Sequence, residues 1–392
     1  MSAAPHLFVI AGEPSGDKLG AAMMAGLKKL APGVRFSGIG GPLMVEQGLT
    51  SRFEMSELSV MGIAEVLPRL PKLMRMVRET ADAVVALRPD ALITIDAPDF
   101  TLRVAARARA AMPDLKTIHY VAPTVWAWRP ERAAKMARHV DHVLALFPFE
   151  PPYMQAEGMT CDFVGHPVVA DPLPDAAAIA AFRGDLGIAP DRQILVVLPG
   201  SRQGEVARME PVFADVAARL FAARPDLQLV IPAAANVAER LAGLVARWPG
   251  RPLLLDPRKG GAGASEDRKR LAFAAGDLAL AASGTVSLEL AAMGTPMVIA
   301  HRFNWLTTRI IKKKVKLKSA TLLNILTDSL DIPEFLFERC RADLIAPYVL
   351  DLLADKDKRQ QQIAVENRVL DMLGRGDEAP GMRAARSVLA AL

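Results

Sequence analysis

Glycine and acidic residues follow the first apolar run of the chain, where the first strand of a sheet would end. Residues 12–17 read Gly-Glu-Pro-Ser-Gly-Asp, and an amphipathic stretch comes next. Glycine lets a ligand approach the backbone, but the two acids would repel a phosphate. We therefore take Glu13, Ser15 and Asp17 as candidates for hydrogen bonds to sugar hydroxyls. The alternative is a tight turn in which Asp17 only caps the following helix.

A second acidic segment follows the apolar run at residues 91–95. Asp96 comes directly after this run, and Asp99 follows three residues later. A carboxylate at the carboxyl end of a buried strand lies where α/β sheets bind ligands, and it is a candidate general base. We expect Asp96 to be the catalytic base and keep Asp99 as the substitute. The alternative is that both acids only cap the next helix.

Aromatic and basic side chains are close together at residues 125–129, which read Val-Trp-Ala-Trp-Arg. Trp126 and Trp128 offer flat apolar faces for a sugar or an acyl chain, and Arg129 can pair with an anion. A plain packing role for the tryptophans is the alternative. His119 lies inside the preceding apolar strand, and we interpret it as a core histidine.

The clearest phosphate-binding pattern lies at residues 198–205, between an apolar run and a helical stretch. The backbone amides of Gly200 and Ser201 and the guanidinium of Arg202 could hold a diphosphate. Glu205, the last residue of this segment, is a further candidate for nucleotide binding. The segment has neither the Gly-Lys-Ser/Thr of a phosphate-binding P-loop nor the G-x-G-x-x-G of a dinucleotide fold. An ordinary strand-to-helix turn remains the alternative.

A similar turn occurs at residues 282–289. Thr285 and the helix N-terminus that follows Gly284 would face the same anion, and Glu289, about one turn into the helix, could accept hydrogen bonds from a ribose. Glu289 could equally be a solvated helical side chain. Two such turns in one half of the chain favour a nucleotide-diphosphate pocket.

The elements that must position these residues alternate between short apolar runs and longer, alanine-rich amphipathic stretches. This rhythm predicts an α/β fold with parallel, doubly wound sheets. The expected strands are residues 7–11, 35–38, 91–96, 116–121, 142–146, 162–165, 194–198, 227–231, 253–255, 278–281 and 297–300. Three prolines at residues 167–174 indicate a linker. We therefore expect two Rossmann-like domains facing across a cleft, at 1–166 and 175–358, followed by helices at 359–392.

Length and composition narrow the class of protein. At 392 residues, the chain exceeds the usual size of a single core, and 51% hydrophobic with 23% charged residues excludes a largely disordered chain. A net charge of +5 is too mild to predict nucleic-acid binding. The two cysteines, Cys161 and Cys340, fit a reducing cytoplasm. We find no signal-peptide pattern and no apolar run long enough for a membrane span.

Two stretches suggest contact with a membrane surface. Residues 58–77 combine many apolar side chains with three basic ones, and Pro68 and Pro71 are expected to prevent one long regular helix there. Residues 312–318 carry a dense lysine cluster. We expect peripheral association with a membrane surface. The alternatives are a core segment for the first stretch and a solvated basic helix for the second.

Seven of these segments together resemble the lipid-A-disaccharide synthases. They occur in the family's order: Gly-Glu-Pro-Ser-Gly-Asp at 12–17, Val-Met-Gly-Ile-Ala-Glu-Val-Leu at 60–67, Ile-Asp-Ala-Pro-Asp-Phe at 95–100, Val-Trp-Ala-Trp-Arg at 125–129, Gly-His-Pro at 165–167, Pro-Gly-Ser-Arg at 199–202 and Ser-Gly-Thr at 283–285. The resemblance implies a two-Rossmann-domain (GT-B) glycosyltransferase. It would join UDP-2,3-diacylglucosamine to 2,3-diacylglucosamine 1-phosphate, releasing UDP, in lipid A biosynthesis.

The resemblance also implies roles for single residues. Asp96 matches the family's essential aspartate, and Arg202 matches its basic residue at the nucleotide site. Asn324 is matched to a residue that contacts the nucleotide in the family. The surrounding motif differs, because this chain has Leu-Leu-Asn where the family has Leu-Pro-Asn. The GT-B pattern implies that the helices after residue 359 cross back to the first domain.

We expect no metal or other cofactor, because the one Asp-x-Asp, at residues 355–357, is far from any strand-to-helix turn. Two other functions stay open. One is an enzyme like UDP-N-acetylglucosamine 2-epimerase, and the other is a nucleotide-regulated lipid-binding protein without catalysis. The oligomeric state also stays open, with a homodimer as one alternative.

Overall fold

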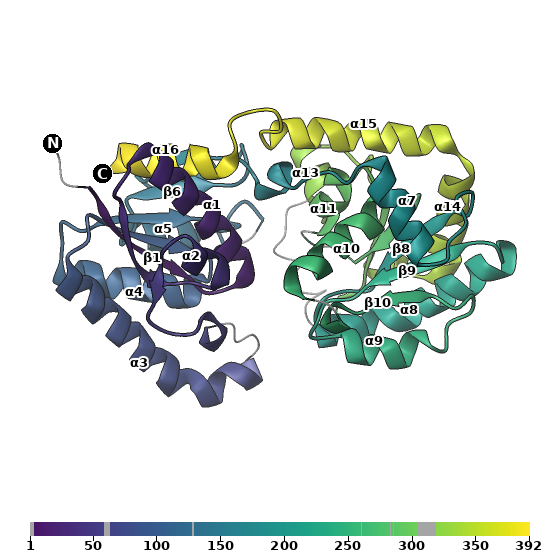
Figure 1. The fold of residues 1–392 in the computed structure, drawn as a ribbon, viewed down its shortest axis with the longest axis horizontal. Coiled ribbons are helices and arrows are strands. Elements are labelled where there is room, and N and C mark those ends of the chain that lie inside the picture. Colours follow the sequence, from purple (N-terminus) through teal and green to yellow (C-terminus); the bar gives the residue numbers. More distant parts are fainter. Residues whose placement is uncertain are drawn as a thin grey trace. The chain divides into compact units, whose positions relative to one another are not determined.

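A computed structural model describes residues 4–58, 63–127, 129–259, 261–282, 284, 286–303 and 319–392, with side chains for all of these except 56, 63–69 and 262. The chain divides into two compact units. The first contains Met1–Ala170 and Met372–Leu392, and the second contains Asp171–Asp371. Figure 1 shows both units and labels part of their helices and strands.

The first unit is built on a parallel sheet in the order β3-β2-β1-β4-β5-β6-β7. Its strands are β1 (His6–Ala11), β2 (Arg35–Ile39), β3 (Thr50–Ser51), β4 (Ala91–Ile95), β5 (Lys116–Tyr120), β6 (His142–Ala145) and β7 (Thr160–Phe163). Its helices are α1 (Pro14–Leu30), α2 (Pro42–Glu46), α3 (Ile63–Leu87), α4 (Pro98–Ala111), α5 (Glu131–Ala137), α6 (Pro151–Gln155) and α16 (Pro380–Ala391). Strands β4 and β6 are buried along their whole length, as continuous apolar runs in a parallel sheet require.

Helix α3 contradicts one expectation. It runs without interruption through Pro68 and Pro71, which we expected to break it. Each proline removes one backbone donor, but the helix continues for four more turns, where Met76, Val77 and Val84 are buried in the core against β1, β4 and α4. Packing of this apolar face outweighs the local cost of the prolines.

The second unit has the parallel sheet order β10-β9-β8-β11-β12-β13. Its strands are β8 (Ile194–Leu198), β9 (Gln228–Pro232), β10 (Leu253–Leu255), β11 (Leu278–Ala281), β12 (Met297–His301) and β13 (Glu334–Leu336). Its helices are α7 (Ala176–Asp185), α8 (Gln203–Ala223), α9 (Ala238–Val245), α10 (Ala262–Ala274), α11 (Val286–Ala292), α13 (Leu322–Thr327), α14 (Ala342–Ala354) and α15 (Lys356–Met372).

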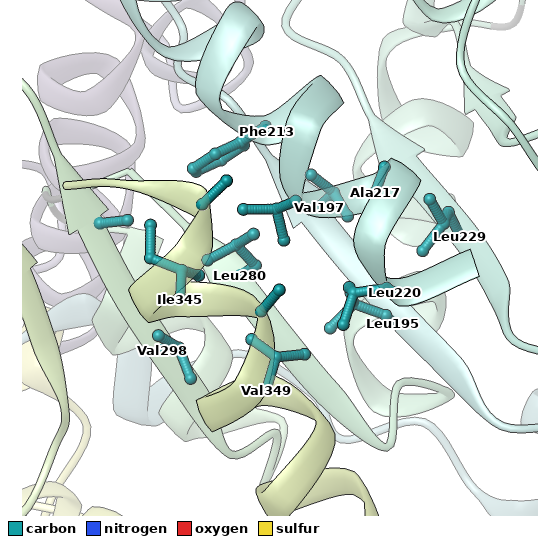
Figure 2. Packing of buried hydrophobic residues seen from close by; sticks show 14 of the residues in the cluster. Leu195, Val197, Phe213, Ala217, Leu220, Leu229, Leu280, Val298, Ile345 and Val349 are labelled. Carbon is teal, nitrogen blue, oxygen red and sulfur yellow. The ribbon is translucent and has the colours of Figure 1, made fainter. Parts of the chain in front are cut away.

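The core of the second unit lies between its sheet and the helices α8 and α14. Figure 2 shows side chains from the two helices meeting those of the strands; the labelled residues are Phe213, Ala217 and Leu220 on α8, Ile345 and Val349 on α14, and Leu195, Val197, Leu229, Leu280 and Val298 on the sheet. All of them are almost completely buried. This apolar layer holds the carboxyl ends of β8, β11 and β12 in fixed positions.

The C-terminal helices divide between the two units. Helix α15 stays with the second unit, where the Gln362 side chain accepts a hydrogen bond of 2.7 Å from the Met297 amide. Helix α16 packs against α1 (Figure 1), and a Cβ on Gly26 would lie only 2.9 Å from the Cβ of Ala385. The division therefore lies at residue 372, later than the expected 359.

Both sheets are doubly wound: successive strands are added on one side of the first strand and then on its other side, so the direction of winding reverses once. The reversal falls between β1 and β4 in the first unit, and between β8 and β11 in the second. Ligands of such sheets bind beyond the carboxyl ends of the strands at the reversal. The predicted α/β class is confirmed. The short strands β3 and β13 were not predicted. Within the described residues, we find no helix long and apolar enough to cross a membrane.

Candidate functional site

The turn from β4 to α4 holds Asp96 in an uncommon backbone conformation. Asp96 has φ 46° and Ala97 has φ 44°, two consecutive non-glycine residues in the left-handed region. Hydrogen bonds fix the turn, because the Asp96 amide donates to the Tyr120 carbonyl (3.0 Å) and the Thr101 hydroxyl donates to the Asp96 carbonyl (2.7 Å). Such strain concentrates at functional sites.

Gly12, at the end of β1, supports this turn from the other side of the sheet reversal. A Cβ at Gly12 would lie 2.8 Å from the Cβ of Ala97, so only glycine fits there without movement. The next residue, Glu13, is the N-cap of α1 and is half-buried, while Ser15 is exposed. Gly12 therefore has a packing reason to be glycine.

Asp17 does not act as expected. Its carboxylate is buried and accepts hydrogen bonds from the amides of Gly41 (2.9 Å), Leu43 (3.0 Å) and Met44 (3.0 Å) at the start of α2. A side chain engaged by three backbone donors holds the turn before α2 and has little capacity left for a sugar hydroxyl. We assign Asp17 a structural role, which corrects the expectation of ligand binding.

A pocket of about 660 Å³ lies within the first unit, at the carboxyl ends of β4 and β5. Asp96 and Asp99 both line it, and Asp99 is exposed in the first turn of α4. Val121, with φ 85°, also lines it, and a β-branched residue rarely adopts this conformation. The rest of the wall contains Pro98, Leu102, Arg103, Ala106, His119, Ala122, Pro123, Thr124, Arg132, Lys135, Met136, Arg138 and His139.

His119 is buried as predicted, but it also lines this pocket, which sequence reasoning missed. Its Nδ1 lies 2.7 Å from the Thr94 hydroxyl, which is itself 3.2 Å from the Ile118 carbonyl. Burial lowers the pKa of His119 to about 4. The imidazole is therefore neutral near pH 7, and the Thr94 contact fixes the orientation of its ring.

Trp126 has a packing role in the next loop. Its ring meets Phe149 edge-on at 5.1 Å, and its Nε1 donates to a carboxylate oxygen of Glu150 at 3.4 Å. Glu150 is buried and also accepts hydrogen bonds from the amides of Leu146 and Phe147, and burial raises its pKa to about 7. Arg129 is exposed, with φ 53°. Trp128 lies outside the described residues.

The glycine turn after β8 lies at the predicted position, but the Glu205 side chain of the same unit lies against it. Gly200 has φ 122°, and a Cβ there would lie 2.4 Å from Cγ of Glu205. The Glu205 carboxylate accepts a hydrogen bond of 3.0 Å from the Ser201 amide. A bound anion would therefore have to displace Glu205 from this amide. Arg202 is the exposed N-cap of α8.

His301, at the end of β12, is a further candidate site residue, which sequence reasoning missed. Its Nδ1 lies 3.7 Å from Glu205 Oε1 and is buried without a hydrogen-bond partner among the described residues. The Nε of Arg208 is likewise buried and unpartnered there. Burial lowers the pKa of His301, and the charge of Glu205 partly opposes this shift. The sequence signal that could have identified it is a histidine at the end of an otherwise apolar strand.

Gly284, after β11, is exposed with φ 151°. Its neighbour Thr285 lies outside the described residues. Glu289 forms an ion pair of 2.6 Å with Lys269 of α10, so its carboxylate already has a cationic partner. Because β8, β11 and β12 are parallel and adjacent, the Gly200 turn, Gly284 and His301 lie at one edge of the sheet.

Asn324 has a structural role, contrary to expectation. It is buried, and its amide group bonds both the carbonyl and the amide of Ile332, each at 2.9 Å. It also donates to Glu334 at 3.3 Å. Glu334 in turn accepts hydrogen bonds from the amides of Ala320 and Thr321. These contacts use the Asn324 side chain to brace the segment before β13, so a nucleotide contact is not supported.

Comparison with known proteins adds to this geometry. A family model described as lipid-A-disaccharide synthetase matches residues 7–385. The lipid-A-disaccharide synthase of Ruegeria pomeroyi is 53% identical over 384 residues, covering 98% of this chain and 94% of that protein. The lipid-A-disaccharide synthase of Rhodospirillum centenum is 47% identical over 384 residues, with the same coverage of 98% and 94%.

Solved structures with low sequence identity share the fold. The UDP-GlcNAc 2-epimerase of Neisseria meningitidis, bound to UDP-GlcNAc, has a TM-score of 0.62 at 10% identity and covers 98% of both chains. The calicheamicin glycosyltransferase CalG4 has a TM-score of 0.55 at 15% identity, covering 99% of this chain and 98% of that one. The predicted GT-B type of fold is thereby confirmed.

Proposed function

The chain belongs to the lipid-A-disaccharide synthase family, and from this premise we propose that it joins UDP-2,3-diacylglucosamine to 2,3-diacylglucosamine 1-phosphate. The products are the β-1,6-linked disaccharide 1-phosphate and UDP. The observation that carries the proposal is the identity of 53% to a named synthase over 98% of the chain. An epimerase-like activity is not favoured, because the epimerase named above shares only 10% of its residues.

The donor is α-linked and the product is β-linked, so the reaction inverts the anomeric carbon in a single displacement. Asp96 acts as the base that takes the proton from the acceptor 6-hydroxyl, with Asp99 as the substitute. The strained, hydrogen-bonded turn at the reversal of the first sheet and its position on the pocket wall support this role. The first unit is then the acceptor-binding domain.

The second unit binds the UDP-sugar. Arg202 and the backbone of the Gly200 and Gly284 turns stabilise the diphosphate as it leaves, at the amino ends of helices after β8 and β11. The buried, unpartnered Nδ1 of His301 supports a ligand contact there as well. In this proposal the hydrogen bond between the Ser201 amide and the Glu205 carboxylate breaks when the diphosphate binds, because the Ser201 amide cannot otherwise donate to the ligand.

The substrates carry acyl chains, so we place the enzyme at the cytoplasmic face of the inner membrane. Helix α3 supports this placement: Leu70 is 44% exposed and Met74, one turn further, is 40% exposed. Lys72 and Arg75 flank them, although each forms an ion pair on this unit. An apolar face bordered by basic residues suits a membrane surface. Residues 59–62 and the lysine cluster at 312–318 lie outside the described residues.

The test is to mix both proposed substrates and follow UDP release and disaccharide formation by mass spectrometry. We expect Asp96→Asn to lower kcat by about 10²–10⁴-fold, the usual contribution of a general base. Asp114→Asn removes an exposed acid of the same unit that does not line the pocket, and serves as the control. Full activity in Asp96→Asn would contradict the assignment, and loss only in Asp99→Asn would move it to Asp99.

A further inference from the structure

The pocket in the first unit carries a group of basic side chains that the reaction scheme has not used. Arg132 and Lys135 lie on α5, and Arg138 follows its end; all three line the pocket. None of them has a side-chain hydrogen bond or ion pair among the described residues. By contrast, Arg109 of the same unit pairs with Asp141 at 2.7 Å. Unpaired cations around a concave surface indicate an anionic ligand.

The neighbouring His139 gives a second observation of the same kind. This residue lines the pocket and is half-buried. Burial lowers its pKa, and the charges of Arg138 and Arg109 lower it further. Arg109 is paired with Asp141, whereas Arg138 is not paired among the described residues, so the positive charge at this end of the pocket comes mainly from Arg138, Arg132 and Lys135.

The pocket also has acidic side chains, and they belong to a different element from the basic ones. Asp96 and Asp99 come from the β4–α4 turn, whereas the three cations come from α5 and the residue after it. A sugar phosphate has matching features, because it presents hydroxyl donors at one end and a dianion at the other. A pocket of about 660 Å³ is also larger than an isolated phosphate needs, and it falls in the range of small-molecule sites.

We propose that Arg132, Lys135 and Arg138 form the subsite for the phosphate monoester of the acceptor sugar. This inference rests on the proposed acceptor, and it makes this group the specificity determinant for a phosphorylated over an unphosphorylated sugar. Arg132 is the central member, because it is half-buried while Lys135 and Arg138 are exposed. A partly desolvated guanidinium binds a phosphate more strongly than an exposed one, and it can do so through two parallel hydrogen bonds.

The experiment compares two acceptors, 2,3-diacylglucosamine with and without its 1-phosphate, at saturating UDP-sugar. The wild-type enzyme is expected to prefer the phosphorylated acceptor in kcat/KM. Arg132→Ala should lower kcat/KM for that acceptor by about tenfold or more, as expected when a charged hydrogen bond is lost, and leave the value for the unphosphorylated one unchanged. Lys135→Ala and Arg138→Ala should act in the same direction by smaller factors.

Lys29→Ala is the matched control, because Lys29 is an exposed cation of the same unit that does not line the pocket. KM for the UDP-sugar should stay constant in every variant. Retention of the wild-type preference in the triple variant Arg132→Ala/Lys135→Ala/Arg138→Ala would overturn the inference. Absence of disaccharide formation by the wild-type enzyme would instead overturn the proposed function, so the two failures are distinguishable.

Soluble probes identify the source of the phosphate group. Glucosamine 1-phosphate should inhibit the wild-type enzyme competitively against the acceptor, and this inhibition should weaken in Arg132→Ala. Inorganic phosphate at equal ionic strength should inhibit far less, because it lacks hydroxyls for the acidic end of the pocket. Equal inhibition by the two probes, or inhibition by glucosamine 1-phosphate that Arg132→Ala leaves intact, would overturn the proposal.

Discussion

Glu150 gives the first unit a pH-dependent stability that can be measured. The carboxyl is only 2% exposed, and burial raises its pKa from 4.5 to about 7. Below pH 4.5 it is protonated in both the folded and the unfolded chain, so it adds no pH dependence. Between pH 4.5 and pH 7 the unfolded chain releases this proton while the folded chain retains it. The free energy of unfolding therefore falls as the pH rises.

The size of this effect follows from the two pKa values. Each pH unit between them lowers the free energy of unfolding by about 1.4 kcal/mol, which gives a total of about 3 kcal/mol. Glu150→Gln keeps an oxygen that can accept from the amides of Leu146 and Phe147, but it cannot ionise. The variant should lack this decline, so its stability relative to the wild type rises between pH 4.5 and pH 7.

Hydrogen exchange of peptides covering residues 142–155 is a suitable assay, because a chain with two units need not unfold in one step. Comparison with the wild type at each pH cancels the intrinsic pH dependence of exchange. Glu157→Gln, at an exposed acid two residues after α6, is the control and should follow the wild type. Parallel profiles for the wild type and Glu150→Gln would refute the argument from burial.

Four further outcomes are expected. Asn324→Ala should lower the free energy of unfolding by about 2 kcal/mol, because it leaves the buried backbone groups of Ile332 unpaired; an unchanged urea midpoint would contradict this. Ser387→Ala removes a 2.6 Å hydrogen bond to Asp162 and should loosen α16 by about 1 kcal/mol, seen as faster proteolysis of the C-terminus. Gly200→Ala places a Cβ 2.4 Å from a side chain of α8 and should weaken UDP binding in calorimetry by about tenfold; equal affinity would argue against this turn as the nucleotide site. EDTA should leave disaccharide formation unchanged, since guanidinium and helix amino ends supply the positive charge; lost activity, restored by a divalent ion, would contradict it.

The strands were largely predictable because buried parallel strands are continuous apolar runs between turn residues. Strands β1, β8, β10 and β11 coincide with predicted segments to within one residue at each end. Strands β3 and β13 have only two and three residues and carry no such run. The continuity of α3 through Pro68 and Pro71 also could not be predicted from the sequence, because it depends on the residues against which the later turns of the helix pack.

The candidate site was predictable at the level of position along the chain, since parallel strands align their carboxyl ends. It was less predictable at the level of single side chains. Asp17 and Asn324 look like ligand-binding residues in sequence, yet the side chains of both form hydrogen bonds to backbone groups. The partners of Asp17 lie 24–27 residues further along the chain, and that of Asn324 lies eight residues further. His119 and His301 look like strand residues, yet one lines the pocket and the other has an unpartnered nitrogen in the described structure.

The sequence by itself determined the α/β class, the two-unit organisation, the family and the turns at which ligands should bind. These properties follow from the spacing of apolar runs and from motifs that are contiguous in the chain. Only the tertiary structure decided which polar atoms remain available, because hydrogen bonds between distant segments occupy some carboxylates and amides and leave others unpaired. The basic wall formed by α5 beside the Asp96 turn is such a case: two segments more than thirty residues apart become one pocket only when β4 and β5 lie side by side.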